Sequence, residues 1–259
     1  MNLLDDLSDA PISTVRDVLH NKSPGFRQIT EMIEYEFFRR GSRPELPPLI
    51  EFSPAVPAHQ IQKAMDDRKI NLYRLSLQPI PIDFTAIPRE LSAIPAWTAF
   101  VKRAEVTARE VGFANEVAAG IAGAIQELAD NVVRHSEVPD SGMAGFANSN
   151  GTFEYIIADA GVGMLQSLRN APEFASLRDD LEALPLAITP GVSRFGRGSG
   201  FGYGFRAVFL PLRAAVGKIR LRSGSAVLSV EGSSIRPDLA RCSQRPHHQG
   251  VVVSVTISP

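Results

Sequence analysis

The sequence lacks most of the features that mark secreted and membrane-spanning proteins. Its 259 residues contain one cysteine, Cys242, so an intrachain disulfide is excluded and a reducing compartment is expected. The N-terminal segment is acidic where a signal peptide is basic, and no apolar run approaches the roughly 18 residues of a membrane span. We therefore expect a cytoplasmic protein with no membrane span.

An excess of basic residues is also missing. Lysine and arginine total 27 against 28 acidic residues, for a net charge of -1. A protein that wraps nucleic acid or binds an anionic membrane needs a positive surface, so neither partner is expected. Hydrophobic residues make up 44% of the chain and charged residues 21%, which is typical of a globular protein with a sizeable core.

Residues 1–69 are predicted to form a small helical extension with proline-rich loops. A helix follows Pro24-Gly25 and ends at Arg39-Arg40-Gly41, where cations and a glycine are favoured. A second short helix is predicted over residues 57–68. We interpret the apolar stripe of the first helix as core, and a contact in a homodimer or with a partner stays open. That stripe comprises Phe26, Ile29, Met32, Ile33 and Phe37.

Residues 70–259 are predicted to form the main domain. A strand from residue 72 should end near Pro79 and Pro81, at a sheet edge. Gly112 is expected to end one helix and Asn115 to cap the long central helix that follows. Asn150-Gly151 is expected to form a hairpin turn, and Gly224 another turn. This order predicts an α+β fold, a two-layer sandwich of a mostly antiparallel sheet with helices on one face. The other expected strands cover residues 144–147, 152–158, 218–223, 226–231 and 251–258, and the helices cover 96–111, 115–135 and a segment ending at Ala215.

The central helix carries a group of polar residues in the segment QELADNVVRHS. Glu127, Asn131 and His135 are spaced by four and therefore share one helix face, flanked by Asp130 and Arg134. This face is opposite an apolar stripe at helical spacing, which indicates a buried surface. The polar group taken alone is also typical of a solvated helix face.

Two glycine-containing segments follow. In IIADAGVGM an apolar strand ends at Asp159, and Gly161 and Gly163 allow close approach of backbone to a planar ligand. In GRGSGFGYGF, from Gly196 to Phe205, glycines occupy alternate positions before a helix, whose free N–H groups and dipole favour an anion such as a polyphosphate. Each segment alone is also typical of an ordinary turn or surface loop.

In their order and spacing the three segments resemble the GHKL ATPases, the histidine kinase-like superfamily with the Bergerat fold. The resemblance covers residues 70–259 and implies that ATP and Mg²⁺ are bound. It implies that Asn131 holds Mg²⁺, Asp159 accepts the adenine amino proton and Glu127 is the catalytic general base. The implied ATP-binding residues are Asn131, Arg134, His135, Asp159, Gly161, Gly163, Arg197, Gly198, Gly200, Gly202 and Gly204.

Three functions are compatible with this resemblance. The first is an ATP-dependent serine/threonine kinase similar to the anti-sigma-factor kinases, acting on a partner such as a sigma factor, a STAS-type antagonist or another phosphoacceptor protein. The second is a histidine-kinase catalytic domain that acts on a histidine in trans. The third is a nucleotide-gated interaction module without turnover. Neither His20 nor His59 begins the His-Glu or His-Asp pattern of an acceptor helix, so transfer to a histidine within this chain is not expected.

Other sites are set aside. Gly217-Lys218 is followed by Ile219, so the P-loop pattern is absent. His247-His248 is interpreted as part of a loop between two strands, because no third metal ligand is nearby in the sequence.

Overall fold

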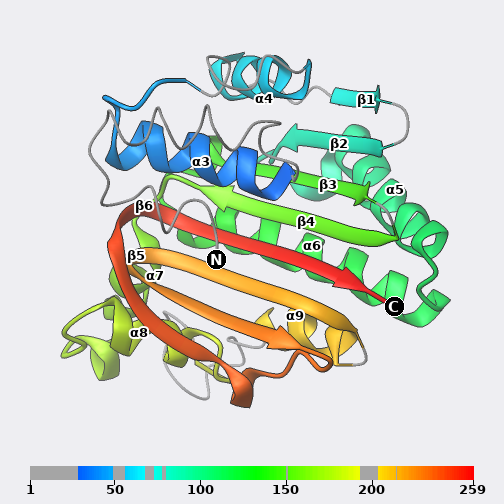
Figure 1. Ribbon diagram of the computed structural model, residues 1–259. Helices are drawn as coiled ribbons and strands as arrows, with labels where there is room; N and C mark the ends of the chain where they lie inside the picture. The colour runs from blue at the N-terminus through cyan, green and yellow to red at the C-terminus, as the bar shows by residue number, and fades with distance from the viewer. Residues whose placement is uncertain are drawn as a thin grey trace.

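The structure is a computed structural model that describes residues 29–48, 56–67, 73–77, 80–149, 151–192, 204–213 and 215–259. These residues form an α+β fold with one antiparallel sheet in the order β1-β2-β3-β4-β6-β5, which confirms the expected class (Figure 1). The strands are β1 (Tyr73–Leu77), β2 (Ile80–Ala86), β3 (Met143–Ser149), β4 (Thr152–Asp159), β5 (Val216–Gly232) and β6 (Arg241–Ser258). The α-helices are α3 (Ile29–Ser42), α4 (Val56–Asp67), α5 (Pro95–Val111), α6 (Asn115–His135), α7 (Gly163–Arg169), α8 (Asp180–Ala187) and α9 (Gly204–Leu212).

The main core lies between the sheet and the helices α5, α6 and α9. Side chains alternate along a strand, so Phe153, Tyr155 and Ile157 of β4 all point into this core. The apolar stripe of α6 meets them, as the sequence predicts, and all its central members are buried. They are Ile121, Ile125, Leu128 and Val132.

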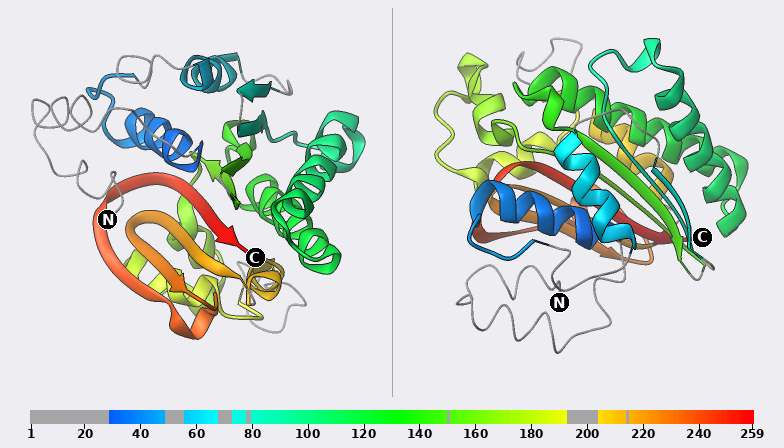
Figure 2. Two further views of the ribbon diagram at one scale, coloured as in Figure 1. Left: turned by 45° about the vertical axis from the view of Figure 1, so that its right-hand side comes forward. Right: turned by 90° about the horizontal axis from the view of Figure 1, so that it is seen from above.

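The opposite face of the sheet is covered by the N-terminal helix α3 (Figure 2). Ile156 and Ala158, which alternate with the residues above, pack against α3 in a second core. The α3 stripe belongs to it: Met32, Ile33 and Phe37 are buried, which confirms the interpretation as core, while Phe26 is outside the described residues. The extension therefore adds a layer to the face of the sheet that the main helices leave uncovered. The domain boundary near residue 70 stays a prediction.

The first expected strand is confirmed as β1, which ends at Leu77 before the prolines and lies at the sheet edge, but the prediction missed the strand β2 that forms a hairpin with it. β1 is the edge strand and pairs with β2, where Pro81 is opposite Ser76. Pairing of β2 with β3 begins one residue later, at Ile82. Pro81 therefore needs no N–H for the ladder with β3, which is why a strand can continue through it.

The prediction of three C-terminal strands is wrong, since two long strands replace them. Gly224 is not a turn: it has φ +54° and lies at a bulge inside β5, where the register with β6 shifts. Asp180, the first residue of α8, stabilises the bulge. Its carboxylate accepts hydrogen bonds from Ser225 N at 2.8 Å and from Ser225 Oγ at 3.0 Å. An added Cβ at Gly224 would meet this carboxylate at 2.2 Å, so only glycine fits.

Local signals around α6 have mixed outcomes. Gly112 ends α5 in the left-handed conformation with φ +115°, as predicted. Asn115 is not the N-cap of α6: Ala114 has that position, and its side chain cannot cap. The β3–β4 hairpin is confirmed, with Gly151 at φ +78°.

Within the described part of the chain, no helix combines the length and apolarity needed to cross a membrane.

Candidate functional site

The last two turns of α6 carry the predicted polar group. Glu127, Asn131 and His135 are each half-buried, on the helix face that the apolar stripe leaves free. Arg134 is exposed and forms an i,i+4 ion pair with Asp130 at 3.9 Å. An exposed pair of this kind contributes little stability, so the Arg134 guanidinium is available to a ligand at small cost.

Asp159 lies at the end of β4 and is buried. Its Oδ1 accepts the Gly161 N–H at 2.7 Å, and the Val251 N–H also hydrogen-bonds its carboxylate. Burial raises the pKa of Asp159 to about 7, although the two N–H groups favour the charged form and partly offset the rise. A buried carboxyl group at a strand end is costly, and such groups are concentrated at functional sites.

The glycine turn, residues 159–163, is joined directly to the C-terminal end of α6. The Val162 N–H donates to the Ser136 carbonyl at 3.0 Å. A Cβ at Gly161 would lie 2.2 Å from the same carbonyl oxygen, so the close approach requires glycine. The two predicted motifs, which are separate in sequence, therefore meet in one place.

The final strands complete the turn with residues that sequence reasoning missed. Gly163 has φ +79°, and the N–H of the next residue, Met164, donates to Ser223 Oγ of β5 at 2.9 Å. Gly250 has φ +81°, and a Cβ there would meet the Asp159 carbonyl at 2.0 Å. Gln249 Nε2 donates to the Gly161 carbonyl at 2.6 Å. In the sequence, the only signal for the close approach of β6 to Asp159 is Gly250, which directly precedes the apolar run that begins at Val251.

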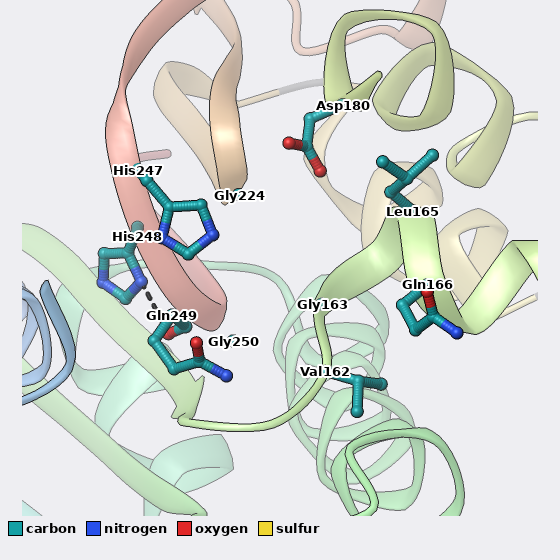
Figure 3. Close-up of a pocket in the computed structure, with 10 residues that line it drawn as sticks. All are labelled: Val162, Gly163, Leu165, Gln166, Asp180, Gly224, His247, His248, Gln249 and Gly250. Atoms are coloured by element: carbon teal, nitrogen blue, oxygen red, sulfur yellow. Dashed lines mark hydrogen bonds between the residues drawn. The ribbon is translucent and has the colours of Figure 1, made fainter. Parts of the chain in front are cut away.

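A small polar cavity of about 130 Å³ lies beside the turn (Figure 3). Among the predicted site residues only Gly163 lines it, so the cavity adjoins the site without containing Asp159 or the polar face of α6. Its other lining residues are Val162, Leu165, Gln166, Asp180, Gly224, His247, His248, Gln249 and Gly250.

His247 and His248 lie in β6, so their interpretation as a loop is wrong. His248 is fully buried, and its Nδ1 is 2.8 Å from the Gln249 carbonyl oxygen. Burial, with the neighbouring Arg222 cation, lowers the pKa of His248 to about 3. The imidazole is therefore neutral at pH 7 and is part of the packing between α3 and the sheet.

The glycine-rich segment is only partly described. Arg197, Gly198, Gly200 and Gly202 lie outside the described residues, and Gly204 begins α9. The helix α9 packs closely on α6, since a Cβ at Gly120 of α6 would be 2.8 Å from Pro211 Cβ. The helix that follows the segment is thus held against the helix that carries Glu127 and Asn131.

The described residues contain no group of three or more His, Cys, Asp or Glu side chains arranged to hold a metal ion. Comparison with known proteins adds no identification: no protein-family model matches the chain, and no curated protein matches its sequence.

Replacement of Gly161 by alanine tests the contact between the two motifs. The added Cβ would overlap the Ser136 carbonyl, so we expect Gly161→Ala to lower the unfolding free energy by about 1–3 kcal/mol, as overpacking does. Gly123→Ala is the matched control on α6, because nothing lies within 4 Å of its Cβ and alanine favours a helix. Equal stability of the two variants in urea unfolding would contradict the tight contact.

Proposed function

We propose that this chain is a Mg-ATP-dependent protein kinase of the GHKL type that phosphorylates a serine or threonine of a partner protein. The observation that carries the proposal is the meeting of the α6 end with the glycine turn, through the Val162–Ser136 hydrogen bond and the Gly161 contact. The end of the helix that carries the polar residues therefore lies against the turn that follows the buried Asp159. A cytoplasmic location fits such a partner kinase.

The described residues supply the hydrogen-bonding and charged groups that an adenine nucleotide with bound Mg²⁺ requires. The Asp159 carboxylate, held in place by Gly161 and Val251, is a buried acceptor for the adenine amino group. Asn131 would hold Mg²⁺ through its amide oxygen, and His135 and Arg134 would contact phosphate oxygens. A hard cation with few protein ligands suits this site, because bound Mg²⁺ keeps several waters and neutralises phosphate charge.

Glu127 is the proposed general base, one helical turn before Asn131. It takes the proton of the acceptor hydroxyl while that oxygen forms a bond to the γ-phosphorus. The bond from this phosphorus to the bridging oxygen breaks, and ADP leaves with the electron pair. The half-buried position of Glu127 suits this step, since the carboxylate is partly shielded from water but still accessible to a partner's side chain.

Binding is tested by thermal unfolding with nucleotide. At a hundredfold excess over Kd, Mg-ATP should add about 2.7 kcal/mol to the unfolding free energy and raise Tm by several degrees. GTP should give a smaller shift, because its ring presents a carbonyl where adenine presents the amino group. An unchanged Tm at millimolar Mg-ATP would contradict the proposal.

The reaction is tested separately by incubation with γ-labelled ATP and a lysate of the source cell. An acid-stable labelled protein supports transfer to serine or threonine. An acid-labile label would instead identify a histidine acceptor, and ATP binding without any label would identify a module without turnover.

A further inference from the structure

Gln249 of β6 lies between the N-terminal helix α3 and the glycine turn. Its N–H donates to Ser42 Oγ at the end of α3, at 3.3 Å. A Cβ at Gly41 would be only 2.7 Å from Gln249 Cβ, so the two segments touch at this point. From β6 the side chain extends toward the turn (Figure 3).

The Gln249 amide continues this connection into the site. Nε2 donates to the Gly161 carbonyl at 2.6 Å and is 3.5 Å from the Ala160 carbonyl. The Gly161 carbonyl belongs to the same peptide group as the Val162 N–H, which donates to Ser136 at the end of α6. Hydrogen bonds on both sides of one peptide group polarise and strengthen each other. The turn is therefore held between α6 and Gln249.

The position of α3 is itself determined by buried charged contacts. Glu34 of α3 lies 3.5 Å from Arg220 and 3.6 Å from Arg222 of β5, and all three side chains are buried. The Arg222 guanidinium lies over the Phe38 ring at 4.9 Å, and this ring also faces His248, the neighbour of Gln249. A helix held by buried ion pairs has a defined position, because any shift leaves charges without their partners.

We propose that Gln249 is a positioning residue that couples the docking of α3 to nucleotide binding at the glycine turn. This inference rests on the proposed function. A correctly docked α3 holds Gln249 against Gly161, which holds the turn and Asp159 in the geometry that receives adenine. By linkage, bound nucleotide stabilises the docked position of α3 to the same extent.

The first test compares Gln249→Ala and Gln249→Glu with the control Gln244→Ala, an exposed glutamine of the same strand. Loss of one hydrogen bond should weaken Mg-ATP binding about three- to tenfold in Gln249→Ala. Gln249→Glu should weaken it more, because a carboxylate would face two carbonyl oxygens. The Val162 amide, followed by NMR hydrogen exchange without nucleotide, should exchange faster in both variants and at the wild-type rate in the control.

The second test is a double-mutant cycle with Gly41→Ala, whose new methyl group would displace Gln249. We expect Gly41→Ala to weaken ATP binding about threefold in the wild-type background and to have little effect in the Gln249→Ala background. Equal weakening in both backgrounds, or wild-type affinity in Gln249→Ala, would overturn the coupling.

The two proposals can fail separately. Tight ATP binding that is unaffected by Gln249→Ala would leave the proposed function and remove the coupling. If the wild-type protein binds no ATP, the proposed function and the coupling to nucleotide both fail, and Val162 exchange in Gln249→Ala and Gly41→Ala then decides whether α3 holds the turn through Gln249.

Discussion

Glu127→Gln is expected to lower phosphoryl transfer by about 100- to 10,000-fold, which is the contribution of a general base. The amide has nearly the same shape as the carboxylate but cannot take the proton of the acceptor hydroxyl. Binding of Mg-ATP should stay within about twofold of wild type, because Asn131 and Asp159 are unchanged. Initial rates of transfer from γ-labelled ATP and a separate nucleotide titration measure the two effects.

The matched control is Glu116→Gln, the same change in the exposed first turn of α6. It should leave both transfer and binding unchanged. That result would show that removing a negative charge from α6 does not by itself lower the rate of transfer. Transfer by Glu127→Gln at the wild-type rate would remove Glu127 from its proposed role without affecting the binding site.

Asp159→Asn is expected to weaken ATP binding and stabilise the fold at the same time. Loss of a charged acceptor for the adenine amino group should weaken binding by about 10- to 100-fold. The wild-type affinity should itself fall as the pH drops below about 7, because the carboxyl group then takes up a proton and no longer accepts through that oxygen. The Asp159→Asn variant should lose this pH dependence, which nucleotide titrations at pH 6, 7 and 8 would measure.

The stability effect of this substitution has a definite sign. The pKa of Asp159 is about 7 in the folded protein and near 3.8 in the unfolded chain. Between about pH 4 and pH 7 the carboxyl group is therefore protonated in the folded state and ionised in the unfolded state. Wild-type stability therefore falls as the pH rises from about 4 to about 7, and the full cost is present above 7. The Asp159→Asn variant avoids this cost, and its advantage should grow to at most about 4 kcal/mol at pH 8.

Urea unfolding at pH 4 and pH 8 measures this difference. Asp140→Asn is the control, since Asp140 is half-exposed and paired with Arg89 on the surface. Its effect should stay within about 0.5 kcal/mol at both pH values. A loss of stability in Asp159→Asn at pH 8 would show that the hydrogen bonds from Gly161 and Val251 outweigh the cost of burying the charge.

Local patterns were sufficient for much of the fold and for one part of the candidate site. The α6 stripe, the Gly112 helix end and the hairpin at Gly151 follow from periodicity and from the conformations open to glycine. The same helical period places Glu127 and Asn131 on one face. These features depend on residues a few positions apart, so a single sequence contains the information.

Contacts between distant segments were not accessible in this way. No local pattern shows that α3 covers the second face of the sheet, or that its end touches Gln249. The sequence around Gly224 predicts a turn, because a turn and a bulge both favour a glycine with positive φ. The two differ only in whether the chain continues along the same neighbouring strand, which for β5 is β6. His248 is buried because α3 lies over β6, whereas its polar sequence neighbours are typical of a loop. Burial and register depend on which segments meet in space, and tertiary packing alone determines that.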